Sequence, residues 1–203
     1  SEILKHQEDI YRRFRNTLRY LLGALSDYTI AEHVSYEQMP DLEKWVLHQL
    51  AKLRELHEKC VEEYDFSTFY TALHTFCSVD LSAFYFDIRK DSLYCDAPNS
   101  VKRRATRTVM NHVFLALTHW LAPVLSFTAE EAWQAYSLSA KEQQESIHER
   151  TFPELDSGWY QPALADKWQS IRDVRRVITN ALELERSAKT IGSSLQAHVA
   201  VYV

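Results

Sequence analysis

Residues that break helices are scarce in this chain: only three glycines and five prolines occur among its 203 residues. Glycine weakens a helix through its backbone freedom, and proline weakens it because it lacks an amide hydrogen. Apolar side chains recur three and four residues apart over most of the chain, which places them on one face of a helix. We therefore expect an all-α fold, a bundle of four or five long helices.

The spacing of apolar residues and the turn residues between them predict where the helices lie. The expected ranges are 5–25, 41–63, 66–87, 100–121, 128–136 and 162–189. The segment 66–87 is apolar nearly all round, which predicts a central position for it. A loop is expected over residues 89–98. Asp65 or Ser67 is expected to cap the third helix, and the run from Thr128 to Glu131 has the form of a capping box.

The C-terminal third differs in character from the rest. Residues 1–137 are predicted to form the core of the bundle, 138–161 an irregular connector, and 162–203 the last long helix with the start of a truncated subdomain. Gly192 is expected to end that helix. Apolar residues alternate from Leu195 to the end, which predicts a short extended segment, the opening strand of a unit that is cut off.

Cysteine usage and hydropathy exclude several classes of protein. Cys60, Cys77 and Cys95 are far apart and odd in number, which argues against a disulfide framework or a zinc knuckle. No apolar run approaches the roughly 20 residues of a membrane span, and no signal peptide is visible. We expect a cytoplasmic protein with no membrane partner. Because the chain begins without Met, we expect it to be a piece of a longer protein.

Positive charge is concentrated in three segments although the net charge is −5. Residues 1–23, 99–123 and 171–203 carry +2, +4 and +2, whereas the intervening segments carry −8 and −5. Folding that gathers these segments would give the molecule a basic face and an acidic back.

The first helix carries a basic stripe opposite its apolar face. At about 100° per residue, Ile10, Phe14, Leu18, Leu21 and Leu25 share one face. Arg12, Arg15, Asn16 and Arg19 fall on roughly the opposite face. Guanidinium groups along a rigid rod suit a phosphate backbone, and the amide can reach a sugar or a base edge. The alternative is a solvated helix face with local ion pairs.

A second basic cluster opens the fourth predicted helix. Lys102, Arg103, Arg104 and Arg107 lie in its first turns, where the helix dipole disfavours cations, and such local violations are often functional. The alternative is that Glu62, Glu63 or Asp65 folds over and neutralises them. Arg89 and Lys90 are weaker candidates in the expected loop, and the cations Arg172, Arg175 and Arg176 fit a solvated helix face.

Nothing in the chain suggests a catalytic centre. His112 and His119 are seven residues apart, too far for the usual metal-binding pair on a helix. There is no nucleophile elbow, and the glycines stand alone, so no phosphate-binding loop is present. The aromatic side chains, among them Trp45, Trp120 and Trp133, have the spacing of core residues and are interpreted as packing. These observations indicate a binding module.

Five segments, in order and covering nearly the whole chain, resemble the anticodon-binding domain of class I isoleucyl-tRNA synthetases. They are residues 13–25 (RFRNTLRYLLGAL), 64–66 (YDF), 76–94 (FCSVDLSAFYFDIRKDSLY), 121–133 (LAPVLSFTAEEAW) and 185–195 (ERSAKTIGSSL). The run at 76–94 is the most specific. It resembles the bacterial and organellar isoleucine branch more than the valine or leucine branches.

The resemblance implies a helical bundle that docks on the anticodon arm of isoleucine tRNA, in protein biosynthesis. It implies a parent ligase whose catalytic and editing domains, with ATP and Mg, and whose zinc-containing C-terminal module are absent here. The fragment alone, which needs no cofactor, is then expected to be inactive. The residues expected to contact tRNA are Arg12, Arg15, Asn16, Arg19, Arg89, Lys90, Lys102, Arg103, Arg104 and Arg107. The alternatives are a valyl- or leucyl-type domain and a helical protein-interaction module.

Overall fold

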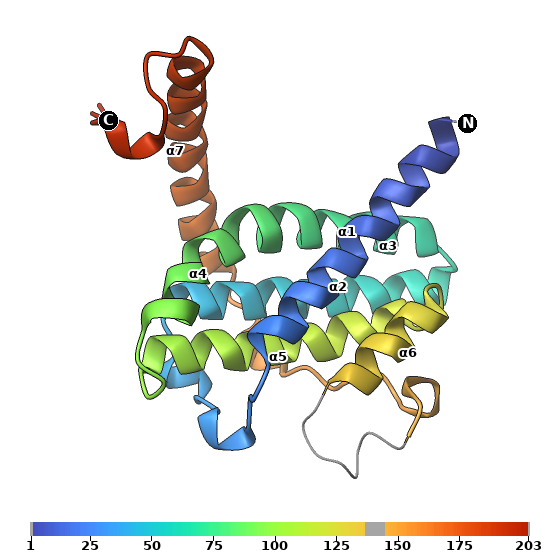
Figure 1. The fold of residues 1–203 in the computed structure, drawn as a ribbon. Helices are drawn as coiled ribbons and strands as arrows, with labels where there is room; N and C mark the ends of the chain where they lie inside the picture. Colours follow the sequence, from blue (N-terminus) through green and yellow to red (C-terminus); the bar gives the residue numbers. More distant parts are fainter. Residues whose placement is uncertain (1, 137–144, 203) are drawn as a thin grey trace. The chain divides into compact units, whose positions relative to one another are not determined.

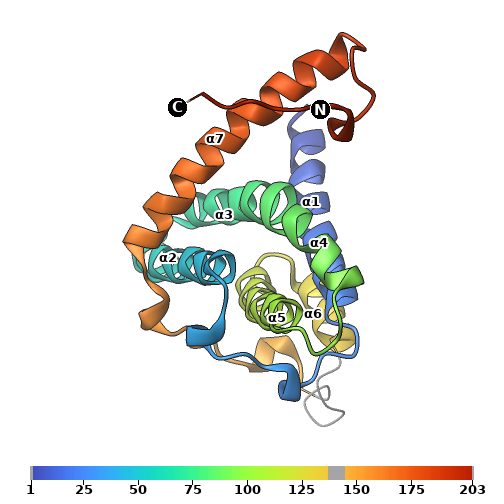
Figure 2. The ribbon, with the colours of Figure 1, turned by 90° about the vertical axis from the view of Figure 1, so that its left-hand side faces the viewer.

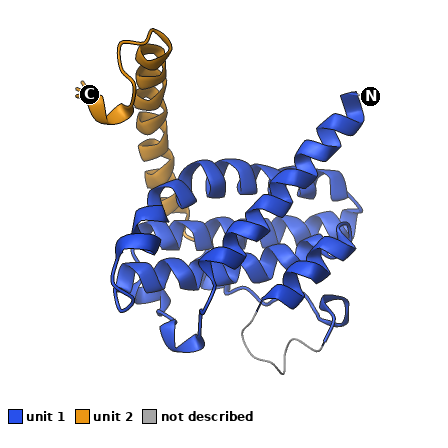
Figure 3. Cartoon of the chain, in the orientation of Figure 1, with its two compact units in different colours: residues 1–160 blue, residues 161–203 orange. Residues whose placement is uncertain are grey.

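The computed structural model describes residues 2–136 and 145–202. Figure 3 shows its two compact units, Ser1–Tyr160 and Gln161–Val203. No strand occurs among the described residues, so the expected all-α class is confirmed.

Within residues 2–136 and 145–160, the first unit contains six α-helices, which Figure 1 labels. Their bounds are Glu2–Ala24 (α1), Asp41–Glu63 (α2), Phe66–Thr75 (α3), Phe86–Cys95 (α4), Val101–Leu121 (α5) and Ser126–Ala135 (α6). A π-helical segment, η3, covers Phe76–Tyr85 and joins α3 to α4 without a break. Short 3₁₀ turns complete the unit: η1 (Ile30–Glu32), η2 (Tyr36–Gln38), η5 (Ile147–Glu149) and η6 (Ser157–Trp159).

The most enclosed helix is α5, and not the segment 66–87 that the sequence places at the centre. It packs against α1, α2, α4 and α6, and Figure 2 shows it nearly end-on between α2 and α6. Its buried residues run almost continuously from Ala105 to Leu121 and include Phe114 and Trp120. Polar side chains such as Thr106, Arg107 and Asn111 are buried along with the apolar ones, because neighbouring helices cover α5 on most sides.

The third predicted helix is longer than expected. It continues through η3 and α4 to Cys95, so the loop predicted over residues 89–98 is wrong over most of its length. A π-helix has more residues per turn than an α-helix, so a template with 3.6 residues per turn loses phase across this segment. The cap at the start of the helix is confirmed, because the Asp65 carboxylate accepts a hydrogen bond from the Thr68 amide at 3.2 Å.

The expected capping box of α6 does not form. The helix begins at Ser126 with no side-chain cap. The Glu130 carboxylate instead accepts hydrogen bonds from the Ser146 hydroxyl and the Ile147 amide, both at 2.9 Å. The described part of the predicted connector packs on the first unit, where Ile147, Leu155 and Trp159 are buried. Residues 137–144 lie outside the described part.

The second unit consists of α7, Pro162–Ser187, and a short 3₁₀ turn, η7, at Ser194–Gln196. Proline occupies the first turn of α7, where its missing amide hydrogen costs nothing. The helix ends before Gly192, with Lys189 in the left-handed conformation at φ 60°. Residues 197–202 form neither helix nor strand, so the predicted strand is not present. Of the described helices, none combines the length and apolarity needed to cross a bilayer.

His112 makes the stability of the first unit dependent on pH. Its ring packs against those of His33 and Trp159, at centroid distances of 6.3 and 4.9 Å. Burial, with a smaller effect of His33, lowers the pKa of His112 from 6.5 to about 4. The unfolded chain binds this proton at a higher pH than the folded chain, so the free energy of unfolding falls as the pH drops through that window.

We predict that His112→Phe lowers, by up to one, the number of protons that the domain takes up on unfolding. The pH dependence of the unfolding free energy, measured with urea between pH 7 and pH 4, gives this number. Some slope remains, because burial also lowers the pKa of His57, His74 and His119. His198→Gln, at an exposed position of the second unit, is the control and should leave the slope unchanged. Equal slopes for wild type and His112→Phe would contradict the assignment.

Candidate nucleic-acid interface

The basic stripe of α1 is exposed as the sequence predicts. Arg12, Arg15, Asn16 and Arg19 all face solvent, while Phe14, Leu18 and Leu21 are buried on the other side of the helix. Arg12 pairs with Glu8 at 2.6 Å and with Asp9 at 3.7 Å, but its side chain is 59% exposed, so these local pairs contribute little. Arg15, Asn16 and Arg19 make no side-chain hydrogen bond or ion pair with any described residue.

A narrow groove of about 160 Å³ runs between α1 and α6. Arg15 and Arg19 line one wall, and Thr128 and Glu131 line the other. Apolar side chains, including Leu18 and Leu22, form the rest of the lining. Two cations without partners therefore border a groove on the side of α1 that faces α6.

A larger groove, of about 440 Å³, lies on the other flank of α1, against η3 and α4. We call it the aromatic groove. Its lining consists of Asn16, Thr17, Tyr20, Ser82, Phe86, Asp87, Lys90 and Tyr94. The rings of Tyr20 and Phe86 are stacked, with centroids 4.3 Å apart and planes 24° apart. The Tyr94 side chain is 79% exposed, so an aromatic face is available at the rim.

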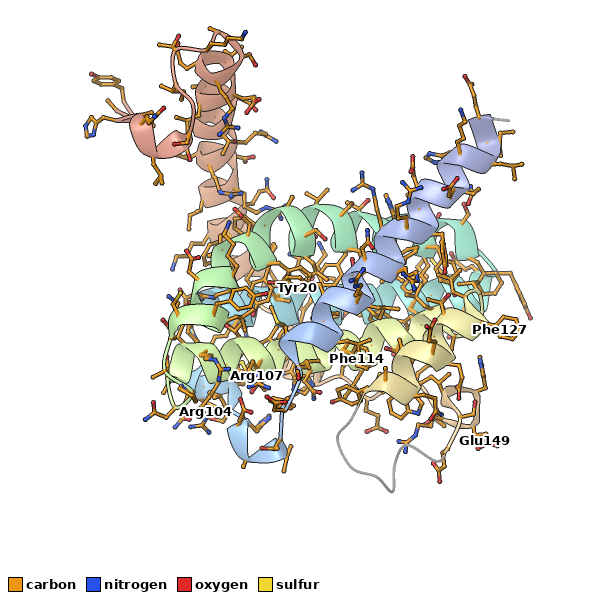
Figure 4. The ribbon with its side chains drawn as sticks, viewed as in Figure 1. Tyr20, Arg104, Arg107, Phe114, Phe127 and Glu149 are labelled. Carbon is orange, nitrogen blue, oxygen red and sulfur yellow. The ribbon has the colours of Figure 1, made fainter. Side chains whose placement is uncertain are left out.

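Polar groups surround this aromatic surface. The Lys90 ammonium donates a hydrogen bond to the Asp87 carboxylate at 2.9 Å, and this contact raises the pKa of Lys90. Burial, and then Tyr94, raises the pKa of Tyr20, whose hydroxyl oxygen is buried beneath the surface of the groove. With the Asn16 amide, the groove offers both donors and acceptors beside a stacking surface. Figure 4 shows Tyr20 directed from α1 toward the side where η3 and α4 lie.

The basic residues at the start of α5 do not form the second phosphate-binding row that the sequence predicts. Arg107 is buried, donates a hydrogen bond to the Ser26 carbonyl at 2.6 Å and pairs with Glu32 at 3.1 Å. Arg104 donates to the carbonyls of Ala31, Glu32 and His33 at 3.2 to 3.3 Å. In Figure 4 both side chains extend toward the segment that joins α1 to α2. Their guanidinium groups hold that segment in place.

Two more arginines that the sequence predicts to contact tRNA instead donate hydrogen bonds within the protein. Arg103 donates to the Leu93 carbonyl at 3.2 Å. Arg89 lies on α4, and not in a loop, and its buried guanidinium makes a two-pronged pair with Glu43. Lys102 and Lys90 stay exposed.

The acidic side chains that neutralise the α5 cations are not those suggested by the sequence. Asp65 caps α3 and Glu63 pairs with Lys59 at 4.0 Å, whereas the carboxylate that pairs with Arg107 is that of Glu32. Glu32 and several backbone carbonyls supply the acceptors. Among residues 2–136 and 145–202, no cluster of His, Cys, Asp and Glu has the form of a metal site.

Residues 43–201 match the family described as the anticodon-binding domain of tRNA ligase. The chain belongs to this family. It is 52% identical over 199 residues, 98% of its length, to the isoleucine–tRNA ligase of Gluconobacter oxydans. It is 47% and 49% identical over its whole length to the isoleucine–tRNA ligases of Brucella abortus and Rhodopseudomonas palustris. It spans about a fifth of the length of each of these relatives.

Sequence reasoning missed the aromatic groove of this anticodon-binding domain. Tyr20 lies within the basic stripe of α1, and Phe86 and Tyr94 belong to the most specific segment of the resemblance. Their aromatic spacing resembled core packing, and the expected loop at 89–98 separated Tyr94 from the preceding helix. The available signal was the presence of an aromatic residue next to Arg19 and Asn16, on the exposed side of an amphipathic helix.

We predict different stability effects for two arginines of the domain. Arg107→Ala should lower the free energy of unfolding by about 2–3 kcal/mol, because it removes a buried partner of Glu32 and of the Ser26 carbonyl. Arg15→Ala should change it by less than about 0.5 kcal/mol, since this side chain is exposed. Urea unfolding followed by tryptophan fluorescence measures both values. Equal losses of unfolding free energy would contradict the assignment of a structural role to Arg107 and not to Arg15.

Proposed function

We propose that this domain binds the anticodon arm of tRNA as part of a cytoplasmic isoleucine–tRNA ligase. The family match and the names of the relatives support the kind of protein and the amino acid. On this proposal, the parent enzyme attaches isoleucine with ATP and Mg in its catalytic domain, and it carries an editing domain and a zinc-containing C-terminal module. The domain itself needs no cofactor and positions the tRNA.

The α1 helix supports binding of the phosphate backbone. Arg15 and Arg19 are exposed and have no partner among the described residues, so their guanidinium groups can bind phosphate without first breaking an ion pair there. Arg12, Lys90 and Lys102 are exposed cations that can add to the attraction. Phosphate contacts of this kind set position and orientation but carry no sequence information. Arg89, Arg103, Arg104 and Arg107 are left out of the proposal because their donors are engaged within the protein.

The aromatic groove supports binding of an unpaired base, and it is the observation that carries the proposal. Proteins that select single-stranded RNA stack splayed bases on aromatic side chains and hydrogen-bond their edges. Tyr94 offers an exposed ring, the Tyr20–Phe86 stack forms part of the wall, and Asn16 supplies an amide. The groove borders the same helix that carries the free cations, so one loop of RNA can occupy both.

We predict that the two arginine clusters respond differently to salt. Arg15→Ala should weaken binding of isoleucine tRNA and lower the slope of log K against log salt by about one, because one phosphate contact is lost. Arg104→Ala should leave that slope unchanged, since its guanidinium binds backbone carbonyls. Fluorescence anisotropy from 50 to 300 mM salt measures the slopes.

Lys59→Ala is the matched control, because Lys59 is an exposed cation on α2, outside both grooves. An unchanged slope for Arg15→Ala would remove α1 from the interface. Competition with valine and leucine tRNAs tests the amino acid, and stronger binding of either would favour the corresponding sibling enzyme.

We predict that Tyr94→Ala weakens tRNA binding about tenfold without changing the salt slope. Stacking of a base on an aromatic ring contributes about 1–3 kcal/mol and releases no counterion. A 2-aminopurine placed in the anticodon loop should be quenched by the wild-type domain and not by the variant. Phe127→Ala is the control, since this ring is 93% exposed on α6 and lines neither groove. Equal quenching by wild type and Tyr94→Ala would contradict base stacking at this position.

A further inference from the structure

A buried carboxylate of α2 accepts hydrogen bonds from three other elements of the bundle. Glu43, in the first turn of α2, is 0% exposed. It accepts two hydrogen bonds from Arg89 of α4, both at 2.6 Å, one from the Tyr85 hydroxyl at 3.2 Å and one from the Thr106 hydroxyl of α5 at 3.1 Å. Four donors therefore satisfy one carboxylate, and they come from η3, α4 and α5.

Stability alone does not account for this arrangement. Removing a carboxylate and a guanidinium from water costs several kcal/mol per ion, and apolar residues of similar size often stabilise a fold as well or better. A two-pronged pair of this kind adds a fixed geometry, because the planar fork of arginine matches the carboxylate in one orientation. The pair therefore fixes the rotation of α4 about its own axis.

The rotation of α4 matters because α4 follows a π-helix. Tyr85 is the last residue of η3, and Phe86 is the first of α4. If the π-helix relaxed by one residue toward α-helical winding, every later side chain would turn by about 100°. Phe86, Lys90 and Tyr94 would then leave the wall of the aromatic groove.

Because α4 is rigid, fixing the direction of its buried residue Arg89 also fixes the directions of its groove-lining residues. Arg89 points to Glu43, while its neighbours in sequence line the groove about a quarter turn or more away around the helix axis. The Tyr85 hydroxyl bonds to the same carboxylate, so the contact holds the junction of the π- and α-helical segments itself.

We propose that Glu43 and Arg89 are positioning residues for RNA binding: their pair holds the π-helical register and thereby presents Phe86, Lys90 and Tyr94 to an unpaired base. This inference rests on the proposed function, because it assigns the pair to the groove that binds the base. Neither residue touches the RNA.

The decisive variant replaces the pair with apolar side chains, Glu43→Leu together with Arg89→Met. Circular dichroism and thermal unfolding should show a folded domain of similar stability. The affinity for tRNA should nevertheless fall about tenfold, and the quenching of 2-aminopurine in the anticodon loop should be lost. The salt slope should fall by no more than the share of one cation, Lys90, because Arg15 and Arg19 lie on α1.

Two single variants complete the test. Arg89→Lys keeps the charge but cannot form the two-pronged contact, and it should also lose the quenching; it decides the question if the double variant does not fold. Thr106→Val removes one donor and leaves the pair intact, and it should quench as the wild type does. A folded double variant or Arg89→Lys variant with full quenching and affinity would overturn the inference.

Hydrogen exchange separates this inference from the proposed function. Without RNA, the amides of 82–95 should exchange faster in the double variant than in the wild type, while those of α1 should not change. If the wild type fails to bind tRNA, the proposed function fails, whatever the exchange shows. If it binds but the exchange and quenching of the double variant match the wild type, only the positioning role is lost.

Discussion

The enclosure of α5 is the constraint on which the rest of the first unit depends. This helix contacts α1, α2, α4 and α6, so its side chains set the distance and register of all four. Its N-terminal end enters the interior with two arginines, and the structure satisfies them with the Ser26, Ala31, Glu32 and His33 carbonyls and the Glu32 carboxylate. Cations near the N-terminus would weaken an isolated helix, but here the two arginines anchor the connection from α1 to α2.

The arginines of α4 and α5 differ in role from those of α1. Those of α5 and Arg89 find acceptors inside the protein, and they fix chain segments that would otherwise lack partners. Those of α1 have few or no acceptors and stay exposed along a helix whose other face is buried. On the proposed function, only the arginines of α1 contact the nucleic acid. The number of basic residues in a segment is therefore a poor guide to phosphate binding. Whether nearby carbonyls and carboxylates already accept their hydrogen bonds is a better one.

The amphipathic spacing was enough to predict α1, α2, α5, α6 and α7 to within a few residues and to place Arg15, Asn16 and Arg19 on an open face. It failed just after the chain leaves α-helical winding, because η3 shifts the phase and makes the polar residues of α4 from Arg89 onward resemble a loop. The partners of Arg89, Arg104 and Arg107 lie 46 to 81 residues away in sequence. Such contacts depend on tertiary packing, which local patterns do not contain.

The position of α1 between two grooves has a consequence for the direction of the RNA chain. Asn16 and Tyr20 line the flank toward α4, while Arg15 and Arg19 line the flank toward α6. On the proposed function, a nucleotide astride this ridge has its base on one side and its phosphate on the other. Ribose joins the two asymmetrically, so only one 5′-to-3′ polarity lets successive nucleotides cross in the same sense. On that function, the ridge favours one strand direction over the other.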